Sequence, residues 1–434
     1  MKYLFRFTVL LLILMQSLHY ECYSQAGTTD SLPDGTNGFY FNARDADTTF
    51  AKDKEDLQPN EFVGTEAMFR IGAGYIGDFT SYAQNEVFKQ QMDSAGLDLS
   101  PSYETRDFRL LFSGRFLKTK RYIAYKFAYM YDGDEKTWLV RESGLTIGIP
   151  ELKGHIFIGR TKEGFSMIKV MNGHSGINNE RQMALDPIPI LADGIKYFGY
   201  LPKSRIFMNL AAYTDLLSKG QSFSTYSSQF IARVGWLPVY NTNTNTVFHI
   251  AANIRYGKPL NNQFTIKSRP ESNPTPQLIN TGQFVTNNAT SIGGEINFRT
   301  GKFMIASEVI SHNFYSNDSA TLHFYGGDLT LSYFLTNTSR PYNTTGNIYG
   351  FVPVKKSVFK GGAGEWEAVL HVATFDLNNG YIHGGQMTRI TPMVNWYLSK
   401  IFRMEFIYGY GILDRFNLKG NVQFFEARIQ VSLL

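Results

Sequence analysis

The sequence predicts an all-β protein, a 16-stranded antiparallel transmembrane β-barrel with one constriction loop folded inward. Apolar and polar residues alternate from about residue 66 onward, the alternating segments run for about ten residues, and their apolar faces often end in Tyr, Phe or Trp. Aromatic residues make up 15% of the 434 residues, and charged residues only 18%. This composition excludes disorder over most of the chain. A bundle of membrane helices is excluded because no later apolar run reaches about 20 residues.

The first residues have the layout of a secretory signal peptide. Lys2 and Arg6 precede the apolar run 7–15, and small residues follow at Ser24 and Ala26. We therefore predict a signal peptide over residues 1–24, with Ala26 as the other plausible cleavage point. A short membrane anchor and a lipid-modified Cys22 are the alternatives, although residues 19–21 are a poor context for lipid attachment.

Composition also bounds the chemistry. Cys22 is the only cysteine, so the exported chain would have no disulfide and no cysteine ligands for zinc or iron–sulfur sites. We expect neither a metal site nor a cofactor. A net charge of +5 without a basic stripe argues against nucleic acid as a partner.

Residues 25–62 form a polar block rich in turn-forming residues, which we interpret as a flexible N-terminal segment. Residues 39–41 are its one candidate for a short docking strand. The remaining residues, 63–434, are predicted to form the barrel domain.

The clearest alternation is in residues 247–256. One face there is apolar, and the other carries His249, Asn253 and Arg255. The sixteen segments with this character are 67–76, 105–117, 120–131, 138–149, 153–161, 193–201, 205–213, 226–237, 247–257, 290–299, 301–311, 321–335, 364–376, 386–398, 401–412 and 421–433.

The links between these segments differ in length. The short links 117–120, 201–204, 300–302 and 398–400 are predicted to be periplasmic turns. The long links 77–104, 258–289 and 336–363 are predicted to be outer loops. The long link 162–192 follows the fifth strand, where a wide barrel commonly folds a loop inward, so we predict that it is the constriction loop. The alternative is an ordinary outer loop.

A soluble β-sandwich would give the same alternation, but three features favour a membrane barrel. The segments are long enough to cross a bilayer, aromatic residues end their apolar faces, and the polar faces suit a wet lumen. In lipid, only a closed barrel satisfies the backbone groups of every strand. With the signal peptide, this predicts the outer membrane of a Gram-negative bacterium.

Several segments together resemble a known family. They are 156–160 followed by 162–166, then 362–367, 376–378 and 384–397. In order and spacing they resemble the phosphate-selective porin O and P family over roughly residues 65–434. The resemblance implies a sixteen-stranded porin, usually a trimer, with basic residues along an anion-selective pore. Two departures are His371, where the family usually carries Arg, and the ending Leu433-Leu434, where barrels often end in an aromatic residue.

Basic residues outnumber acidic residues on the predicted lumen faces, ten to seven. The predicted basic wall comprises Arg70, Arg109, Arg115, Lys126, Arg233, Arg255, Arg299 and Arg389, with Arg403 and Arg428 beyond them. For the constriction itself we predict Lys162 and Lys169, with Arg160 and Arg181 next, because a ring of charge at a narrow point sets selectivity. The alternative is that a wall cation pairs with a neighbouring acid and only holds the wall together.

These features predict an outer-membrane porin whose water-filled channel passes small anions by passive diffusion. Phosphate as a solute and a homotrimer are implied by the resemblance, and outer-membrane lipid is the expected surrounding. The alternatives are a general small-solute or sugar porin and a structural barrel with a blocked lumen. We predict no catalytic residue, because His174-Ser175 lacks the Gly-x-Ser-x-Gly turn and 361–364 lacks the helix of a phosphate loop.

Overall fold

A computed structural model describes residues 60–317, 320–416 and 418–433. The predicted signal peptide, 1–24, and the predicted polar segment as far as residue 59 lie outside these residues, as does the candidate strand at 39–41.

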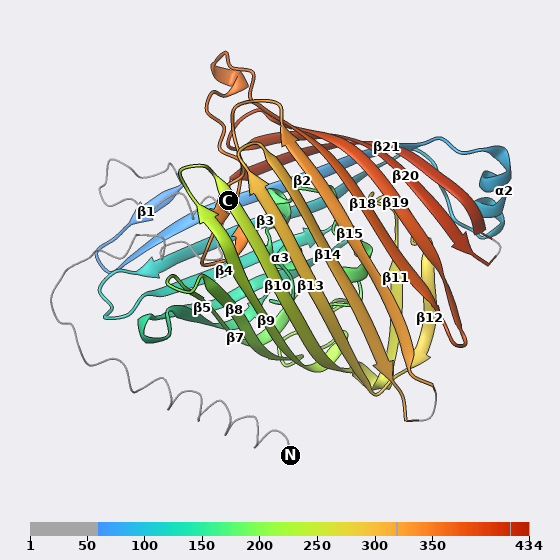
Figure 1. Cartoon of the computed structure of the whole chain (residues 1–434), viewed down its shortest axis with the longest axis horizontal. Helices are drawn as coiled ribbons and strands as arrows, with labels where there is room; N and C mark the ends of the chain where they lie inside the picture. The colour runs from blue at the N-terminus through green and yellow to red at the C-terminus, as the bar shows by residue number, and fades with distance from the viewer. Residues whose placement is uncertain (1–59, 318–319, 417, 434) are drawn as a thin grey trace. The chain divides into compact units, whose positions relative to one another are not determined.

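Sixteen long strands form one closed antiparallel β-barrel, in which each strand pairs with the next along the chain (Figure 1). The last strand pairs with the first, Tyr75 lying opposite Val431, and this pairing closes the ring. The barrel strands are β2 (Ala67–Tyr82), β3 (Ser102–Phe116), β4 (Ile123–Asp132), β5 (Thr137–Ile149), β6 (Gly154–Thr161), β7 (Ala192–Leu201), β8 (Ile206–Thr214), β9 (Tyr226–Asn241), β10 (Thr246–Pro259), β13 (Asn288–Thr300), β14 (Phe303–Tyr315), β15 (Leu322–Phe334), β18 (Glu365–Asn379), β19 (Ile382–Tyr397), β20 (Phe402–Arg415) and β21 (Leu418–Leu433).

The predicted fold is therefore confirmed, and each of the predicted segments overlaps one barrel strand. Alternation also assigns the two faces correctly: Ile254 is 50% exposed on the outer face, whereas the next residue, Arg255, is fully buried on the inner face. A short strand, β1 (Glu61–Val63), pairs with β2. No helix in the described part of the chain is long and apolar enough to span a membrane.

The links lie at two ends of the barrel. The four short links predicted as turns share one end, the turn end. The link 335–364, between β15 and β18, lies at this same end, because each strand reverses the chain direction. The prediction that 336–363 is an outer loop is therefore wrong. This link contains a small hairpin of β16 (Tyr342–Asn343) and β17 (Ile348–Tyr349).

Three long links lie at the opposite, outer end. The first contains helix α2 (Glu86–Ser94), whose first turn is capped by the Asn85 side chain, which accepts a hydrogen bond from the Phe88 amide at 2.8 Å. The second contains the short helix α3 (Met167–Val170), and the third the hairpin of β11 (Gln263–Ser268) and β12 (Ile279–Val285).

The core of the molecule lies inside the barrel. At the outer end, Phe264 and Phe284 of the β11–β12 hairpin pack against Phe314 and Phe324 of the wall. Deeper inside, Met167 of α3 and Met171, which follows α3, belong to one apolar cluster with Tyr342 and Tyr349 of the turn-end link. Segments from both ends thus meet in the interior and narrow it.

Candidate functional site in the barrel interior

Residues 162–191, here called the inward loop, cross the barrel interior as predicted. Side chains of strands β14 to β21 and of the turn-end link bind its backbone. Seven of its carbonyl oxygens accept from such side chains: those of His174 from Gln430, Ser175 from Arg340, Gly176 from Arg403, Ile177 from Asn395, Asn179 from Arg428, Arg181 from Arg389 and Ala184 from His312. The loop is therefore fastened through its main chain over residues 174–184.

Two wall carboxylates hold the start of α3. Glu295 accepts from the Met167 amide at 3.3 Å, and Glu308 accepts from the Ile168 amide at 3.1 Å. Glu295 also accepts hydrogen bonds from Nε and Nη2 of Arg233, each at 2.8 Å, and lies 3.0 Å from Nε2 of His249. This one carboxylate joins three wall strands to the inward loop.

A glycine in the wall lets the loop approach closely. A β-carbon on Gly74 of β2 would lie 2.7 Å from the ring of His174, closer than real side chains come. On its other side, the His174 ring is bound to the Ser432 hydroxyl of β21 at 2.5 Å. Residues 173–176 therefore close against the barrel wall.

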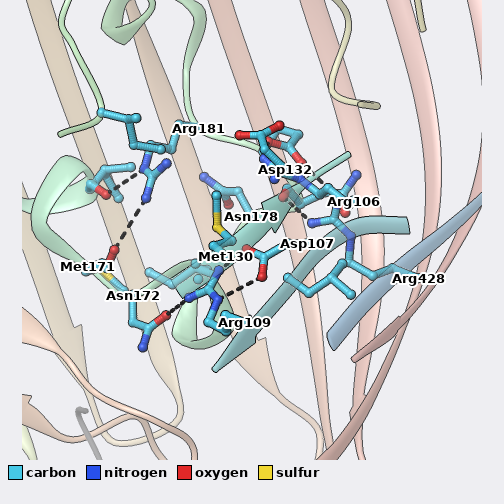
Figure 2. A pocket seen from close by; sticks show the side chains of 18 of the residues that line it. Arg106, Asp107, Arg109, Met130, Asp132, Met171, Asn172, Asn178, Arg181 and Arg428 are labelled. Atoms are coloured by element: carbon cyan, nitrogen blue, oxygen red, sulfur yellow. Dashed lines mark hydrogen bonds and ion pairs between the residues drawn. The ribbon is translucent and has the colours of Figure 1, made fainter. Parts of the chain in front are cut away.

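Two neighbouring cavities remain between the inward loop and the wall. The larger, about 380 Å³, opens toward the outer end beside the third outer link, and the smaller, about 90 Å³, lies deeper beside β3 and β4 (Figure 2). The charged residues that line both cavities are Arg106, Asp132, Arg141, Glu180 and Arg181. Among the described residues lining the two cavities, nine are basic and six are acidic. The surroundings of a solute in these cavities carry a net positive charge.

Two β-bulges turn additional arginines into this region. On β3, Ile76 pairs with Asp107 and Gly77 with Thr105, so Arg106 is the inserted residue. On β5, Ala128 pairs with Glu142 and Tyr129 with Val140, so Arg141 is inserted in the same way. A bulge breaks the two-residue period and re-aims a side chain. Strict alternation assigns both arginines to the lipid face, which is why the sequence prediction missed them.

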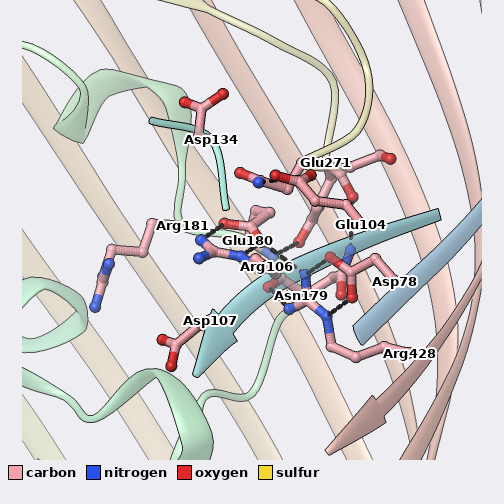
Figure 3. Close-up of polar contacts among 12 residues, drawn as sticks. Asp78, Glu104, Arg106, Asp107, Asp134, Asn179, Glu180, Arg181, Glu271 and Arg428 are labelled. Carbon is pink, nitrogen blue, oxygen red and sulfur yellow. Dashed lines mark hydrogen bonds and ion pairs between the residues drawn. The ribbon is translucent and has the colours of Figure 1, made fainter. Parts of the chain in front are cut away.

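Arg106 belongs to an ion-pair chain that joins the wall to the loop (Figure 3). Its guanidinium donates to both oxygens of Glu180, at 2.6 and 2.7 Å. Arg428 also donates to Glu180, at 2.8 Å, and to both oxygens of Asp78 at 2.7 Å. With two carboxylates facing two guanidinium groups, this chain is close to neutral.

Three further guanidinium groups line the smaller cavity: those of Arg109 and Arg181, which are labelled in Figure 2, and that of Arg141. Arg141 and Arg181 are the two with the least compensation. Arg109 pairs with Asp107 and also donates to the Asn172 side chain at 3.1 Å. Arg141 lies 3.7 Å from Glu142, a carboxylate already bound by Lys126 at 2.5 Å. Arg181 donates, among the described residues, to the carbonyls of Ile168 and Met171. These three guanidinium groups are the charge centre of the site.

The other predicted constriction residues lie differently. The Lys162 ammonium is buried and donates to the carbonyls of Val170 and Met171, and Lys162 lines neither of the two cavities. The Lys169 ammonium is also buried and donates to the carbonyls of Leu185 and Ile188, although the residue borders the larger cavity. Arg160 binds Asp193 at 2.7 Å. Of the four, Arg181 is the one that borders both cavities.

Most of the predicted basic wall is paired with acids. The pairs are Arg70 with Glu61, Arg109 with Asp107, Lys126 with Glu142, Arg233 with Glu295, Arg255 with Glu163 and, at 3.8 Å, Arg389 with Glu271. Arg115 donates to the Met68 sulfur, and Arg299 to the Arg340 carbonyl. His371, the departure from the family pattern, lies between Glu271 and Asp328. These contacts match the wall-holding alternative.

Among the described residues, no group of His, Cys, Asp and Glu side chains is arranged to hold a metal ion. The site instead consists of guanidinium groups, carboxylates and backbone carbonyls around the two cavities of about 90 and 380 Å³.

Comparison with protein families finds a match to phosphate-selective porin O and P over residues 102–431. Comparison with curated proteins finds no match. Among solved structures, the chain is similar to OmpT, an outer-membrane protein of Vibrio cholerae, at 10% identity and a TM-score of 0.54 over 86% of this chain and 99% of that chain.

Two further structures show the same likeness. A trimer form of OmpT from Vibrio cholerae has 10% identity and a TM-score of 0.50 over 85% of this chain and 99% of that chain. An anion-selective porin from Comamonas acidovorans has 11% identity and a TM-score of 0.54 over 85% of this chain and all of that chain, 100%. At these identities the likeness shows a shared barrel fold.

Proposed function

The chain belongs to the phosphate-selective porin O and P family of the Gram-negative outer membrane, and from this premise we propose that its channel passes small anions, phosphate among them, by passive diffusion. The observation that carries the proposal is the meeting of Arg109, Arg141 and Arg181 at the smaller cavity. A guanidinium group suits phosphate because its planar fork matches two oxygens at once.

The charge balance supports a modest preference rather than a tight site. The excess of bases over acids around the cavities attracts anions, while the neighbouring carboxylates keep any one position from holding an anion for long. Conduction needs this combination, since an ion must enter readily and leave again. The similar Comamonas acidovorans protein is an anion-selective porin, which points the same way.

The inward loop is the proposed constriction. It contributes Arg181 to both cavities and Lys169 to the larger one. We also propose a homotrimer, which the family and the similar trimer form of OmpT support.

The second candidate is a porin for small solutes of any charge. The pairing of most wall cations favours it, because paired charges act mainly within their own pair and little on a passing ion. The two candidates differ in one measurable quantity, the ratio of anion to cation permeability.

Reversal potentials in asymmetric potassium chloride, measured across planar bilayers, test the proposal. The wild-type channel should prefer chloride, and phosphate should reduce the chloride current by competing for the same arginines. Arg141→Gln together with Arg181→Gln should shift the reversal potential toward cations, most clearly at low salt, where charges are screened least. Arg121→Gln is the matched control, because this arginine is exposed in a turn and pairs with Glu151. A wild-type channel that prefers potassium would favour the general-solute porin instead.

A further inference from the structure

The turn-end link carries an exposed projection that the channel does not use. After the buried residues Val352 and Val354, residues 355–364, here called the turn-end finger, turn away from the barrel (orange in Figure 1). The Val358 amide donates to the Leu398 carbonyl at 2.9 Å, and the Lys355 amide to Glu365 at 3.2 Å. The finger is therefore ordered against the barrel rather than loosely attached.

Aromatic side chains place the finger at the edge of the lipid-facing surface. Trp366 and Trp396, on neighbouring strands, stack with ring centroids 4.7 Å apart. Both indole N–H groups donate to the Ala363 carbonyl of the finger, at 3.2 and 3.0 Å. Phe359 is 66% exposed and contacts Phe402, itself 40% exposed on the outer face of β20, with ring centroids 5.5 Å apart. Tryptophan in a membrane protein concentrates at the level of the lipid headgroups.

The charged side chains of the finger are all basic. Lys355, Lys356 and Lys360 are exposed, and Lys400 lies exposed in the neighbouring turn. Among the described residues, none of these four ammonium groups forms an ion pair, in contrast to Lys118, which pairs with Glu66 at the same end. Glu365, the acidic residue that directly follows the finger in the sequence, is buried and accepts a hydrogen bond from the Lys355 amide.

We propose that the turn-end finger is a lipid-binding element that takes the phosphodiester headgroups of anionic phospholipids in the leaflet at the turn end. Its lysines bind the phosphates, and Phe359 enters the top of the acyl region beside Phe402. A basic group beside an inserted aromatic ring is the combination that binds an anionic membrane surface. The exposed apolar part is one ring continuous with the lipid-facing belt, which suits lipid better than a soluble protein that would need a broad patch.

The first test measures lipid preference with the full chain. Native mass spectrometry counts the lipids retained from bilayers of phosphatidylethanolamine mixed with phosphatidylglycerol. The wild type should retain phosphatidylglycerol preferentially. Replacing Lys355, Lys356 and Lys360 with Gln should lower this preference roughly tenfold, and added salt should weaken it too. The matched control replaces three exposed lysines of the outer links, Lys89, Lys136 and Lys219, and should leave the preference unchanged.

The second test locates the finger. The Phe359→Trp variant has one more tryptophan than the wild type. The fluorescence that this tryptophan adds should be quenched by lipids that carry bromine near the top of the acyl chain. Equal retention of the two lipids by the wild type and the finger variant, or an added indole fluorescence that these lipids do not quench, would overturn the proposal. Loss of the trimer on a semi-native gel when Lys355, Lys356 and Lys360 are replaced with Gln would also overturn the proposal, because it would show that the finger contacts another copy of the chain. Ion selectivity is not read out in either test, so the outcome is independent of the proposed anion preference.

Discussion

Replacing Glu295 with Gln should loosen the inward loop while keeping the side chain's shape. Glu295 accepts two hydrogen bonds from Arg233 at 2.8 Å, one from Asn253 at 2.8 Å and one from the Met167 amide at 3.3 Å. A glutamine keeps one acceptor oxygen, but its NH₂ group faces the N–H groups of Arg233. The variant therefore leaves a fully buried guanidinium without a counter-charge.

The expected cost follows from those contacts. Hydrogen bonds to charged groups contribute about 1.5–3 kcal/mol each, and two of them join Arg233 to Glu295. Breaking a buried ion pair by removing one partner generally costs about 3–5 kcal/mol, because the remaining charge stays buried. We expect the free energy of unfolding to fall by an amount in this range.

Two measurements check this prediction: urea unfolding in lipid vesicles and single-channel conductance. Glu295→Gln should unfold at lower urea and conduct more, since the start of α3 loses its anchor. The control is Glu151→Gln, the same substitution in an exposed pair with Arg121, which should change neither property. If Glu295→Gln matched this control in both measurements, the inward loop would not depend on the wall carboxylate and the reasoning would be refuted.

Two further predictions concern the barrel wall and pH. Ile254→Arg, on the lipid-facing side of β10, should lower the free energy of unfolding by about 2–4 kcal/mol near the bilayer midplane. Thr242→Arg, in an exposed turn, should lower it far less. Equal losses for the two variants in urea unfolding would contradict the assignment of faces. Burial lowers the pKa of the Lys169 ammonium, which lies on the inward loop, to about 7. Lys169 is thus charged below this pH and neutral above it, so the anion preference should fall as pH rises through about 7, and reversal potentials of Lys169→Met should not show this step.

Alternation was sufficient to predict the wall because a membrane barrel has only two faces. Every residue of a strand points either to lipid or to the interior, and a charge on the lipid side is costly. Ile254 and Arg255 show the result, one exposed and the other fully buried. Strand count also followed, since each crossing needs its own segment of about ten residues.

The charge centre of the site was harder to predict because it depends on bulges. Arg106 and Arg141 are each the inserted residue of a β-bulge, which strict alternation does not include. A signal was nevertheless present. In Arg106-Asp107 and Arg141-Glu142, strict alternation would place one charge of each pair in lipid, at about 2–4 kcal/mol, and a bulge avoids this cost.

The pairing of the wall cations could not be predicted from local sequence. Arg255 binds Glu163, which lies 92 residues away in the inward loop, and only the path of that loop brings them together. By contrast, the place of the link 335–364 was available from the strand order. It joins the twelfth strand to the thirteenth, and every connection that leaves an even-numbered strand lies at the turn end.

The fastening of the inward loop through its carbonyl oxygens has a consequence for how this channel can diverge. Every amino acid supplies a backbone carbonyl, so the hydrogen bonds from Gln430, Arg403 and Arg428 do not depend on which side chains the loop carries. Substitutions within residues 174–184, apart from residues such as His174 and Glu180, whose side chains also bind the wall, should therefore alter the surface of the channel without releasing the loop. Substituting one of the donors should instead loosen the loop, because it removes a hydrogen bond that no loop residue replaces. The side chains of the loop can therefore change in related channels, whereas the donor residues on the wall must be kept for the loop to stay in place.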